Sequence, residues 1–505
     1  MSPVDLPRLR WPIAPPGSGD TSTAPDVARR CPPVARPASG HPTVDPKVEL
    51  VGLNQSGVLE RRTLVRALLA SPLLVPLAGL AGCGNPRPAD EGLHPDPTAD
   101  LLVARSNEPR AAPSSGFAEG AAESLSHFGG RLVQALAPKT PSENLIVSPY
   151  SVAAALTMTR LGAVGETAAA MDEALSVPPP PPGARVAGPG LAPGMNSLGQ
   201  QLATASANRV TWSDANSLWG QRGVAWESGF LDSVARWFGT GMHESDFAGA
   251  PEQARGNINR WTEDRTAGKI PEILAAGMVS ANTRLVLVNA VHFKAPWATP
   301  FIENATRTAR FTRLDGRAVD AEMMTGARGT GFHDSARGCS VVTVTFQGGD
   351  FGFTAVLPDA GREAAAHAWL TSGDAAMREV LVPRVPASRQ MRPPAMLEMP
   401  RFSLRYSAEL TPALTALGMG IAFGGGADFS GMSASERLSI GLVAHQATLD
   451  VDEKGAEAAA ATAVVMEMSG GGLHVALDRP FYVVLHDTAT NSPLFFGYVA
   501  DPTAT

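Results

Sequence analysis

The side chains in this sequence with the most obvious chemistry are serines and histidines that a hydrolase could use. Ser148 and His445 would be the pair to assemble, because a histidine base activates a serine nucleophile. Ser148, however, lies in the apolar string Leu145–Pro149, where a buried and hydrogen-bonded hydroxyl is the usual arrangement. The sequence contains no G-x-S-x-G nucleophile elbow and no glycine-rich phosphate loop. We therefore expect a protein that has no catalytic residues and is not an enzyme.

Metal and nucleic-acid chemistry are also disfavoured by the residue pattern. The string H-E-S-D-F at His243 lacks the second histidine of a zinc-protease helix, so we expect no metal and no cofactor. Lys and Arg total 41 against 48 Asp and Glu, the net charge is -7, and there is no basic block. A nucleic-acid partner is not expected from such a balance.

The first 115 residues have the pattern of an export signal followed by a tether. Residues 1–58 are rich in Pro, Gly, Ser and Arg, which predicts a disordered leader or a mis-assigned translation start. Residues 59–82 combine a basic start at Arg61-Arg62 with an apolar run that is too short to span a bilayer about 30 Å thick. The run ends in Leu80-Ala81-Gly82-Cys83.

That ending resembles the bacterial lipobox, in which the cysteine is acylated, and it predicts a lipoprotein anchored in a membrane through Cys83. The twin-arginine and Sec export routes both stay open. Residues 83–115 are Pro-rich and polar and are predicted to be a flexible linker. The expected location is outside the cytoplasm: membrane-anchored and facing the periplasm or cell surface, or extracellular.

The rest of the chain, residues 116–505, is expected to form one folded domain. Helical spacing dominates early, as in the stretch 121–136, whereas strand-like runs such as 284–293 and 438–451 dominate later. This order favours an α+β fold over a doubly wound α/β fold. Five consecutive prolines within residues 177–196 predict a Pro-rich loop inserted at the surface.

Several strings in this domain together resemble the serpins, the large serine-protease inhibitors. The strings are N-L-I-V-S-P-Y-S at 144–151, I-N-R-W at 258–261, L-V-N-A-V-H-F-K at 287–294, M-P-R-F at 399–402, A-D-F-S-G at 427–431 and D-R-P-F at 478–481. The resemblance implies three β-sheets, A, B and C, eight to nine helices, and an exposed reactive-centre loop over residues 453–473. A monomer is expected.

The function that the resemblance implies is inhibition by suicide-substrate trapping. A serine protease, or alternatively a cysteine protease, would cleave the loop and stay bound in a covalent 1:1 complex while the loop inserts into the central sheet. The seventeenth residue counted from Glu453 is Ser469, which places the reactive bond at Ser469–Gly470, with Met468–Ser469 as the alternative. Because no Arg or Lys occurs from 456 to 473, the expected targets are elastase-, chymotrypsin- or subtilisin-like. The alternative function is a non-inhibitory serpin that acts as a binding or carrier module.

By propensity the alanine-rich stretch 456–468 reads as a helix, yet its residues also fit a strand that inserts. Inserted strands alternate faces, and the two charges of the stretch, Glu457 and Glu467, both fall on odd positions.

The resemblance assigns three further groups of residues by their place in the motifs. The hinge is Glu453, Lys454, Gly455, Ala456, Ala458, Ala460 and Thr462. The shutter, a hydrogen-bonded cluster beneath the opening sheet, is Ser148, Ser151, Asn289 and His445. The breach, where the loop first inserts, is Trp297 with an expected pair between Arg401 and Glu453.

Overall fold

The structure is a computed structural model, and it describes residues 102–178, 188–206, 210–373, 376–381, 394–456 and 472–504. The predicted α+β fold is confirmed: the described residues contain nine α-helices and two hydrogen-bonded sets of strands. The helices are α1 Ser115–Leu136, α2 Pro149–Arg160, α3 Gly165–Ala174, α4 Ala192–Ala205, α5 Ser228–Phe238, α6 Pro251–Arg265, α7 Glu363–Leu370, α8 Ala376–Leu381 and α9 Thr411–Ala416.

The first of the two sets of strands is a seven-stranded sheet, here called sheet A. Its strand order is β1-β4-β3-β5-β13-β12-β11, and β5 also pairs directly with β12. Its strands are β1 Leu102–Ala104, β3 Thr211–Gln221, β4 Met242–Ser245, β5 Leu285–Pro296, β11 Phe402–Glu409, β12 Leu442–Val451 and β13 Gly455–Ala456. The two-residue strand β13 is therefore wedged between two strands that are paired with each other along the rest of their length.

The second set has nine strands, joined through one long bent strand. Its order is β14-β10-β7-β8-β9-β15-β16-β2, and β6 pairs with β7 off this path. Residues 318–323 of β7 pair with β6, residues 323–330 pair with β10 and residues 330–334 pair with β8, so β7 connects two sheets, B and C. The strands are β2 Leu145–Val147, β6 Arg307–Thr312, β7 Ala318–Asp334, β8 Cys339–Thr345, β9 Phe351–Pro358, β10 Pro394–Pro400, β14 Leu473–Ala476, β15 Phe481–Asp487 and β16 Pro493–Val499.

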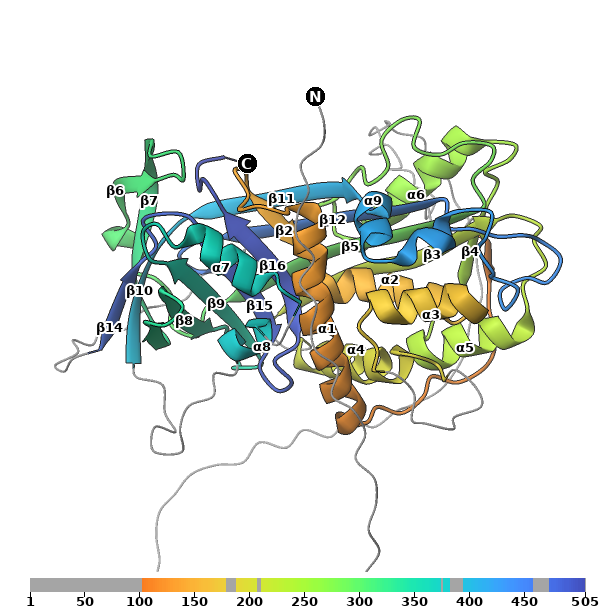
Figure 1. Ribbon diagram of the computed structural model, residues 1–505, viewed down its shortest axis with the longest axis horizontal. Coiled ribbons are helices and arrows are strands. Elements are labelled where there is room, and N and C mark those ends of the chain that lie inside the picture. The colour runs from red at the N-terminus through yellow and green to blue at the C-terminus, as the bar shows by residue number, and fades with distance from the viewer. Residues whose placement is uncertain are drawn as a thin grey trace, which may run out of the picture. The chain divides into compact units, whose positions relative to one another are not determined.

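Two hydrophobic cores lie on opposite faces of sheet A. The smaller joins α6 to β3, β5 and β12 through residues such as Ile258, Trp219 and Val288. The larger packs the other face onto α1, α2 and α4 and continues into sheets B and C. Figure 1 shows α6 above the strands of sheet A and helices α2 to α5 below them. Opening sheet A would therefore disturb packing on both faces.

The chain before α1 is more ordered than its composition predicts, so the linker boundary at 115 is wrong. Leu102–Ala104 forms β1, antiparallel to β4 at the edge of sheet A, and residues 105–114 contact α5 and α4. Ser106 binds α5 through its hydroxyl, and Ala111 and Ser114 bind α5 and α4 through main-chain groups, a role that composition cannot distinguish from a tether. Residues 1–101, including the predicted signal segment and Cys83, lie outside the described residues.

The predicted loop insertion 177–196 also ends too late. Helix α4 begins at Ala192, and Pro193 lies in its first turn, where proline is tolerated because that N–H has no partner in the helix. The five consecutive prolines are residues 178–182, and all of them except Pro178 lie outside the described residues. No helix in the described part of the chain is long and apolar enough to cross a membrane.

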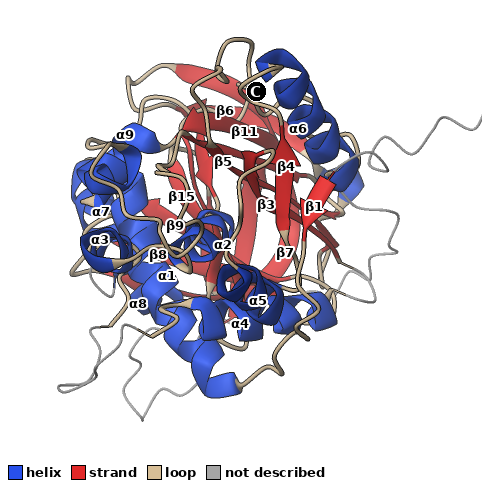
Figure 2. Ribbon diagram, turned by 90° about the vertical axis from the view of Figure 1, so that its right-hand side faces the viewer, coloured by secondary structure: helices blue, strands red, loops and turns tan. Residues whose placement is uncertain are grey.

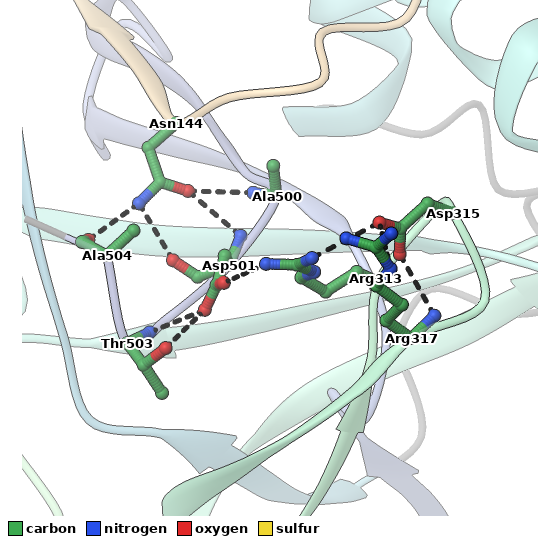
Figure 3. Close-up of polar contacts among 8 residues, drawn as sticks. All are labelled: Asn144, Arg313, Asp315, Arg317, Ala500, Asp501, Thr503 and Ala504. Carbon is green, nitrogen blue, oxygen red and sulfur yellow. Dashed lines mark hydrogen bonds and ion pairs between the residues drawn. The ribbon is translucent and has the colours of Figure 1, made fainter.

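The C-terminus is fixed by a polar cluster that Figure 3 shows in detail. The Asn144 carboxamide accepts from the N–H groups of Ala500 and Asp501 and donates to the carbonyls of Asp501 and Ala504. The Asp501 carboxylate in turn pairs with Arg313 at 3.0 Å. The last residues of the chain are thereby fixed to the start of β2 and to the β6–β7 hairpin.

Candidate functional site

The base of the predicted reactive-centre loop is held at the top of sheet A by main-chain and side-chain contacts. Trp297 donates from its N–H to the Lys454 carbonyl and from its indole Nε1 to the Asp452 carbonyl, both at 2.9 Å. Phe301 N donates to the Glu453 carbonyl at 2.9 Å. Three successive carbonyls of the loop base are therefore bound, which fixes the direction in which the loop leaves the sheet.

The expected pair between Arg401 and Glu453 is present. Arg401 Nη2 lies 2.6 and 2.8 Å from the two carboxylate oxygens of Glu453, and Thr306 Oγ1 donates to the same carboxylate at 2.6 Å. Burial alone would raise the pKa of Glu453, but the hydrogen bonds from Thr306 and Arg401 and the charge of Arg401 leave that pKa below its usual value. Glu453 is thus held ionised at the breach.

Trp297 belongs to a small aromatic cluster beneath the loop base. Its ring stacks on Phe346 at 4.4 Å between centroids and meets Phe353 and Phe301 edge-on. Trp297 and Phe346 also form an isolated bridge between their backbones. These contacts hold the Trp297 ring in place beneath the loop base, since aromatic pairs of this geometry add to the stabilisation from burial.

A tight turn brings the loop from β12 into β13. The Asp452 carboxylate accepts from Lys454 N at 2.8 Å and from Gly455 N at 3.1 Å, and Asp452 N donates to the Gly455 carbonyl. A Cβ on Gly455 would lie 2.0 Å from the Ala295 carbonyl oxygen. Only glycine can approach β5 this closely.

Ala456 is the first residue of the loop that occupies a place in the sheet. It pairs with Ala295 of β5 and with Val451 of β12, both antiparallel, and its side chain is fully buried. Of the stretch 456–468, Ala456 is the part that the structure describes, and its burial in the larger core places this even position on the inward face. The remaining predicted loop residues, Ala458, Ala460, Thr462, Met468, Ser469 and Gly470, lie outside the described residues.

The four predicted shutter residues are brought together where β5 and β12 pair below β13. Asn289 and His445 are directly opposite in the parallel pair β5–β12, and His445 Nδ1 is 2.6 Å from Asn289 Oδ1. Ser148 N donates to His445 Nε2 at 3.3 Å, while Ser148 caps α2 by accepting from Ser151 N. The cluster joins both strands of the closed gap to the helix beneath them.

These partners settle both the tautomer of His445 and the direction of its pKa shift. Because Ser148 N–H points at Nε2, that nitrogen must accept, and Nδ1 must carry the proton that it donates to Asn289. Burial lowers the pKa of His445 to about 4, and a second proton would place two N–H groups face to face. The Ser148 hydroxyl donates instead to the Leu494 carbonyl at 2.6 Å, so it is not directed at the imidazole as a nucleophile would be.

Sequence reasoning missed two members of these clusters, Asn216 and Thr306. Asn216 lies on β3 directly opposite Asn289 and accepts from Ser151 Oγ at 2.6 Å. It carries the shutter one strand further, but no motif in the sequence pointed to it, because only the paired register brings it beside Asn289. Among the described residues, the amide nitrogens of Asn216 and Asn289 are buried and have no hydrogen-bond partner.

Comparison with known proteins identifies the class to which this architecture belongs. Residues 123–502 match the family described as serpin (serine protease inhibitor), and the chain belongs to that family. The description of the family is that of protease inhibitors, not of catalysts.

Among its relatives, the leukocyte elastase inhibitor of Bos taurus is 32% identical over 378 residues, which cover 74% of this chain and 97% of the relative. Human kallistatin has a similar structure, with a TM-score of 0.65 at 27% identity, covering 77% of this chain and 100% of that one. Human thyroxine-binding globulin in complex with its ligand has a TM-score of 0.65 at 25% identity, covering 77% and 100%. The similar proteins thus include one named for inhibition of a protease and one named for binding a small molecule.

Proposed function

We propose that this protein inhibits elastase-, chymotrypsin- or subtilisin-like serine proteases by trapping them covalently while its loop inserts into sheet A. The observation that carries the proposal is β13: two residues of the loop base already lie between β5 and β12, in register with both. The start of an additional central strand is therefore formed before any cleavage, and the strands below it are closed on each other.

The register of β13 gives the place of every further loop residue in an inserted strand. Each step along the loop moves one residue back along β5 and β12, because both pairings are antiparallel. Thr462, six residues after Ala456, would then lie opposite Asn289 on one side and His445 on the other. Insertion would replace the Asn289–His445 hydrogen bond by contacts to Thr462, the polar member of the inward-facing positions.

The buried polar atoms of the shutter support this reading. Asn289 Nδ2 is a donor with no partner among the described residues, and leaving such a group unpaired costs roughly 1–3 kcal/mol. The Thr462 hydroxyl could accept from it in the inserted strand. The closed sheet thus holds a polar mismatch that an inserted loop would relieve, in addition to about 0.5–1.5 kcal/mol for each new hydrogen bond of the ladder.

The chemistry of trapping requires only the protease's own catalytic groups. The protease serine attacks the carbonyl carbon of Ser469 (or Met468), the bond to the next residue breaks, and the new amine takes a proton and leaves. An ester then joins the protease to the loop. Insertion of about sixteen residues at ~3.3 Å each would carry the protease roughly 50 Å from its docking position. Distortion of its active site would prevent hydrolysis of the ester.

The test is incubation of the purified protein with pancreatic elastase, chymotrypsin and subtilisin, followed by denaturing gel electrophoresis. We expect a band of the combined mass that resists denaturant, as a covalent 1:1 complex would. Mass spectrometry of the released C-terminal fragment then distinguishes cleavage at Ser469–Gly470 from cleavage at Met468–Ser469. Cleavage without any complex would reject inhibition and favour the binding or carrier function.

We propose in addition that the chain is exported and acylated at Cys83. The basic start, the apolar run and the L-A-G-C ending of residues 59–83 support this. Expressed in a bacterial host, the protein should mature to a chain that begins at Cys83 and carries the mass of acyl groups, whereas Cys83→Ser should lack them. A mature chain without lipid, or with a different first residue, would contradict the proposal.

A further inference from the structure

The segment 102–114, here called the N-terminal strap, connects the edge of sheet A to the helices on its lower face. Its first three residues pair with β4, with Leu102 opposite Glu244 and Ala104 opposite Met242. It then passes along α5 and α4 and continues into α1, as Figure 1 shows, and Figure 2 shows β1 beside β4 at the edge of the sheet.

The strap is bound to α5 by three contacts. Ser106 Oγ donates to the Asp232 carboxylate, and Glu108 pairs with Arg236 at 3.1 Å. Ala111 N donates to the Arg236 carbonyl at 2.7 Å, near the end of that helix. The ion pair is largely exposed and contributes little, so the main-chain bond is the more important of these contacts.

The contacts to α4 involve buried side chains. Arg110 Nε donates to Asn196 Oδ1 at 2.9 Å, and Asn196 Nδ2 donates to the Ala111 carbonyl at 3.0 Å. Ser114 N donates to Ser197 Oγ at 2.9 Å. Asn196 and Ser197 are only 1% and 2% exposed, so release of the strap would remove partners from polar groups in the interior, which is costly.

Beyond α4 the strap continues into α1, which is anchored to the opposite part of the molecule. The carbonyl of Ala137, at the end of α1, lies 2.8 Å from His367 Nε2 of α7. Arg131 donates to the Leu417 carbonyl, and His127 contacts the Gly373 carbonyl. The strap therefore joins β4, on one side of the β5–β12 gap, to α1, which is bound to α7, to Gly373 and to Leu417, the last of which lies in the chain between β11 and β12.

Inserting a strand into that gap must move β5, β3 and β4 away from β12 by about one strand spacing, ~4.8 Å. We propose that the N-terminal strap resists this movement and slows the opening of sheet A, and so prolongs the lifetime of the native state before cleavage. This inference rests on the proposed function, since it concerns the rate of the same insertion. Contacts that are present in the native state and lost in the transition state slow the conversion.

Gly241, next to β4, provides a selective way to displace the strap. A Cβ at this position would lie 2.4 Å from the Ala104 carbonyl oxygen, 2.8 Å from Arg105 Cγ and 3.1 Å from Val103 Cγ1. All three nearest atoms belong to the strap, so Gly241→Ala should displace it and leave the rest of sheet A in place. Gly229→Ala in α5 is the matched control, because a Cβ added there would meet nothing within 4 Å.

The experiment measures uptake of a fluorescent peptide with the sequence of residues 456–468 by the uncleaved full chain. Such a peptide can occupy the gap in sheet A only when the sheet opens, and no protease is involved. We expect uptake to be about tenfold faster in Gly241→Ala than in the wild type, as for loss of an interaction of about 1.4 kcal/mol, and unchanged in Gly229→Ala. Hydrogen exchange of amides 102–112 verifies that the strap is released. Arg110→Ala, which frees the other end, should also speed uptake.

Wild-type uptake rates in both strap variants, with their strap amides exchanging freely, would overturn the proposal, and so would slower uptake. If the wild type and all variants fail to take up the peptide even on prolonged incubation, sheet insertion itself fails and the proposed function falls with it. A variant that takes up peptide faster but still forms the covalent complex with protease supports the strap as a brake separate from the trapping chemistry.

Discussion

His445 is the residue where the closed state of sheet A is most sensitive to its surroundings. It bridges β12 to Asn289 on β5 and to Ser148 at the start of α2, and all three positions are fully buried. Since each ring nitrogen has one defined role, adding a proton changes the side-chain hydrogen bond that links β12 to β5 at this level. The shutter should therefore respond to pH.

The first prediction concerns that response. The pKa of His445 falls from 6.5 to about 4 on folding, so between these values the unfolded chain binds the proton and the native protein does not. Stability is then fully present above pH 6.5 and is lost as the pH falls toward 4, by about 2 kcal/mol at pH 5. Denaturant midpoints at pH 7.5 and pH 5 should differ less in His445→Gln than in the wild type.

His243 has its pKa lowered to about 4 by burial and by Arg105 and Arg265, so some acid sensitivity should persist in that variant. His474→Gln serves as the control, because its ring is half exposed at the end of sheet C. If His445→Gln kept the full difference between the two pH values, another group would have to be responsible.

At this scale the sequence predicted the shutter and breach residues only because their motifs resemble a family. Spacing alone placed none of them together: Ser148 and His445 are 297 residues apart. Asn216 and Thr306 have no motif around them, and they join their clusters through strand register and a loop contact. Such partners cannot be found until the pairing of β3 with β5 and the position of Glu453 are known.

Among the elements, the loop base and the closed pair β5–β12 define where a new strand can form. Ala456 is paired on both sides, and below it His445 and Asn289 are still opposite each other. The faces of an inserted strand follow from Ala456 being buried. In an inserted strand, even positions would point into the larger core and odd positions to the α6 side.

The second prediction tests that alternation. Thr462→Glu would place an unpaired carboxylate between Asn289 and His445, at a cost of several kcal/mol. Insertion should become slower than hydrolysis of the ester, so most molecules should be cleaved and few should form the complex. Ala461→Glu is the control on the opposite face; in the same register it lies opposite Ala290 and the half-buried Gln446, so it should lose less complex formation than Thr462→Glu.

Gel quantification of cleaved protein against complex measures the difference. Equal losses in the two variants would contradict the register, because the same charge would then act regardless of the face it occupies. Greater loss in Ala461→Glu would reverse the assignment of faces.

The elements predicted from the sequence were those with a strong period or a start signal, such as α2 after Pro149 and the apolar strand β5. Strand β1 was missed because three residues after a Pro-rich stretch have no period to detect, and its pairing with β4 is decided by tertiary contact. The start of α4 was misplaced because Pro193 reads as a loop residue until it is recognised in the first turn of a helix.

For the whole molecule, the proposed mechanism requires that the intact fold is not its most stable form. One further strand in sheet A would add about a dozen hydrogen bonds and relieve the unpaired polar groups of the shutter. The third prediction is that cleavage of the loop raises the midpoint of thermal unfolding by roughly 10–20 °C, given an unfolding entropy of about 2.1 cal/mol/K per residue.

Calorimetry before and after limited cleavage by subtilisin measures this shift, and Thr462→Glu is a suitable control because it should be cleaved without full insertion. A midpoint that stays the same or falls after cleavage of the wild type would show that the loop does not enter the sheet.

The polar cluster at the C-terminus would link two separate chains once the loop is cut. Cleavage after Ser469 makes residues 470–505 a separate polypeptide, whose described strands β14, β15 and β16 are hydrogen-bonded within sheets B and C. The described residues contain no disulfide that could hold the two pieces, and Cys339 is free and buried. Asn144 and Arg313, through their contacts to Asp501, would therefore help the sheet hydrogen bonds to hold the C-terminal fragment on the rest of the cleaved protein. That protein should elute as one species in native chromatography and separate into two only in denaturant.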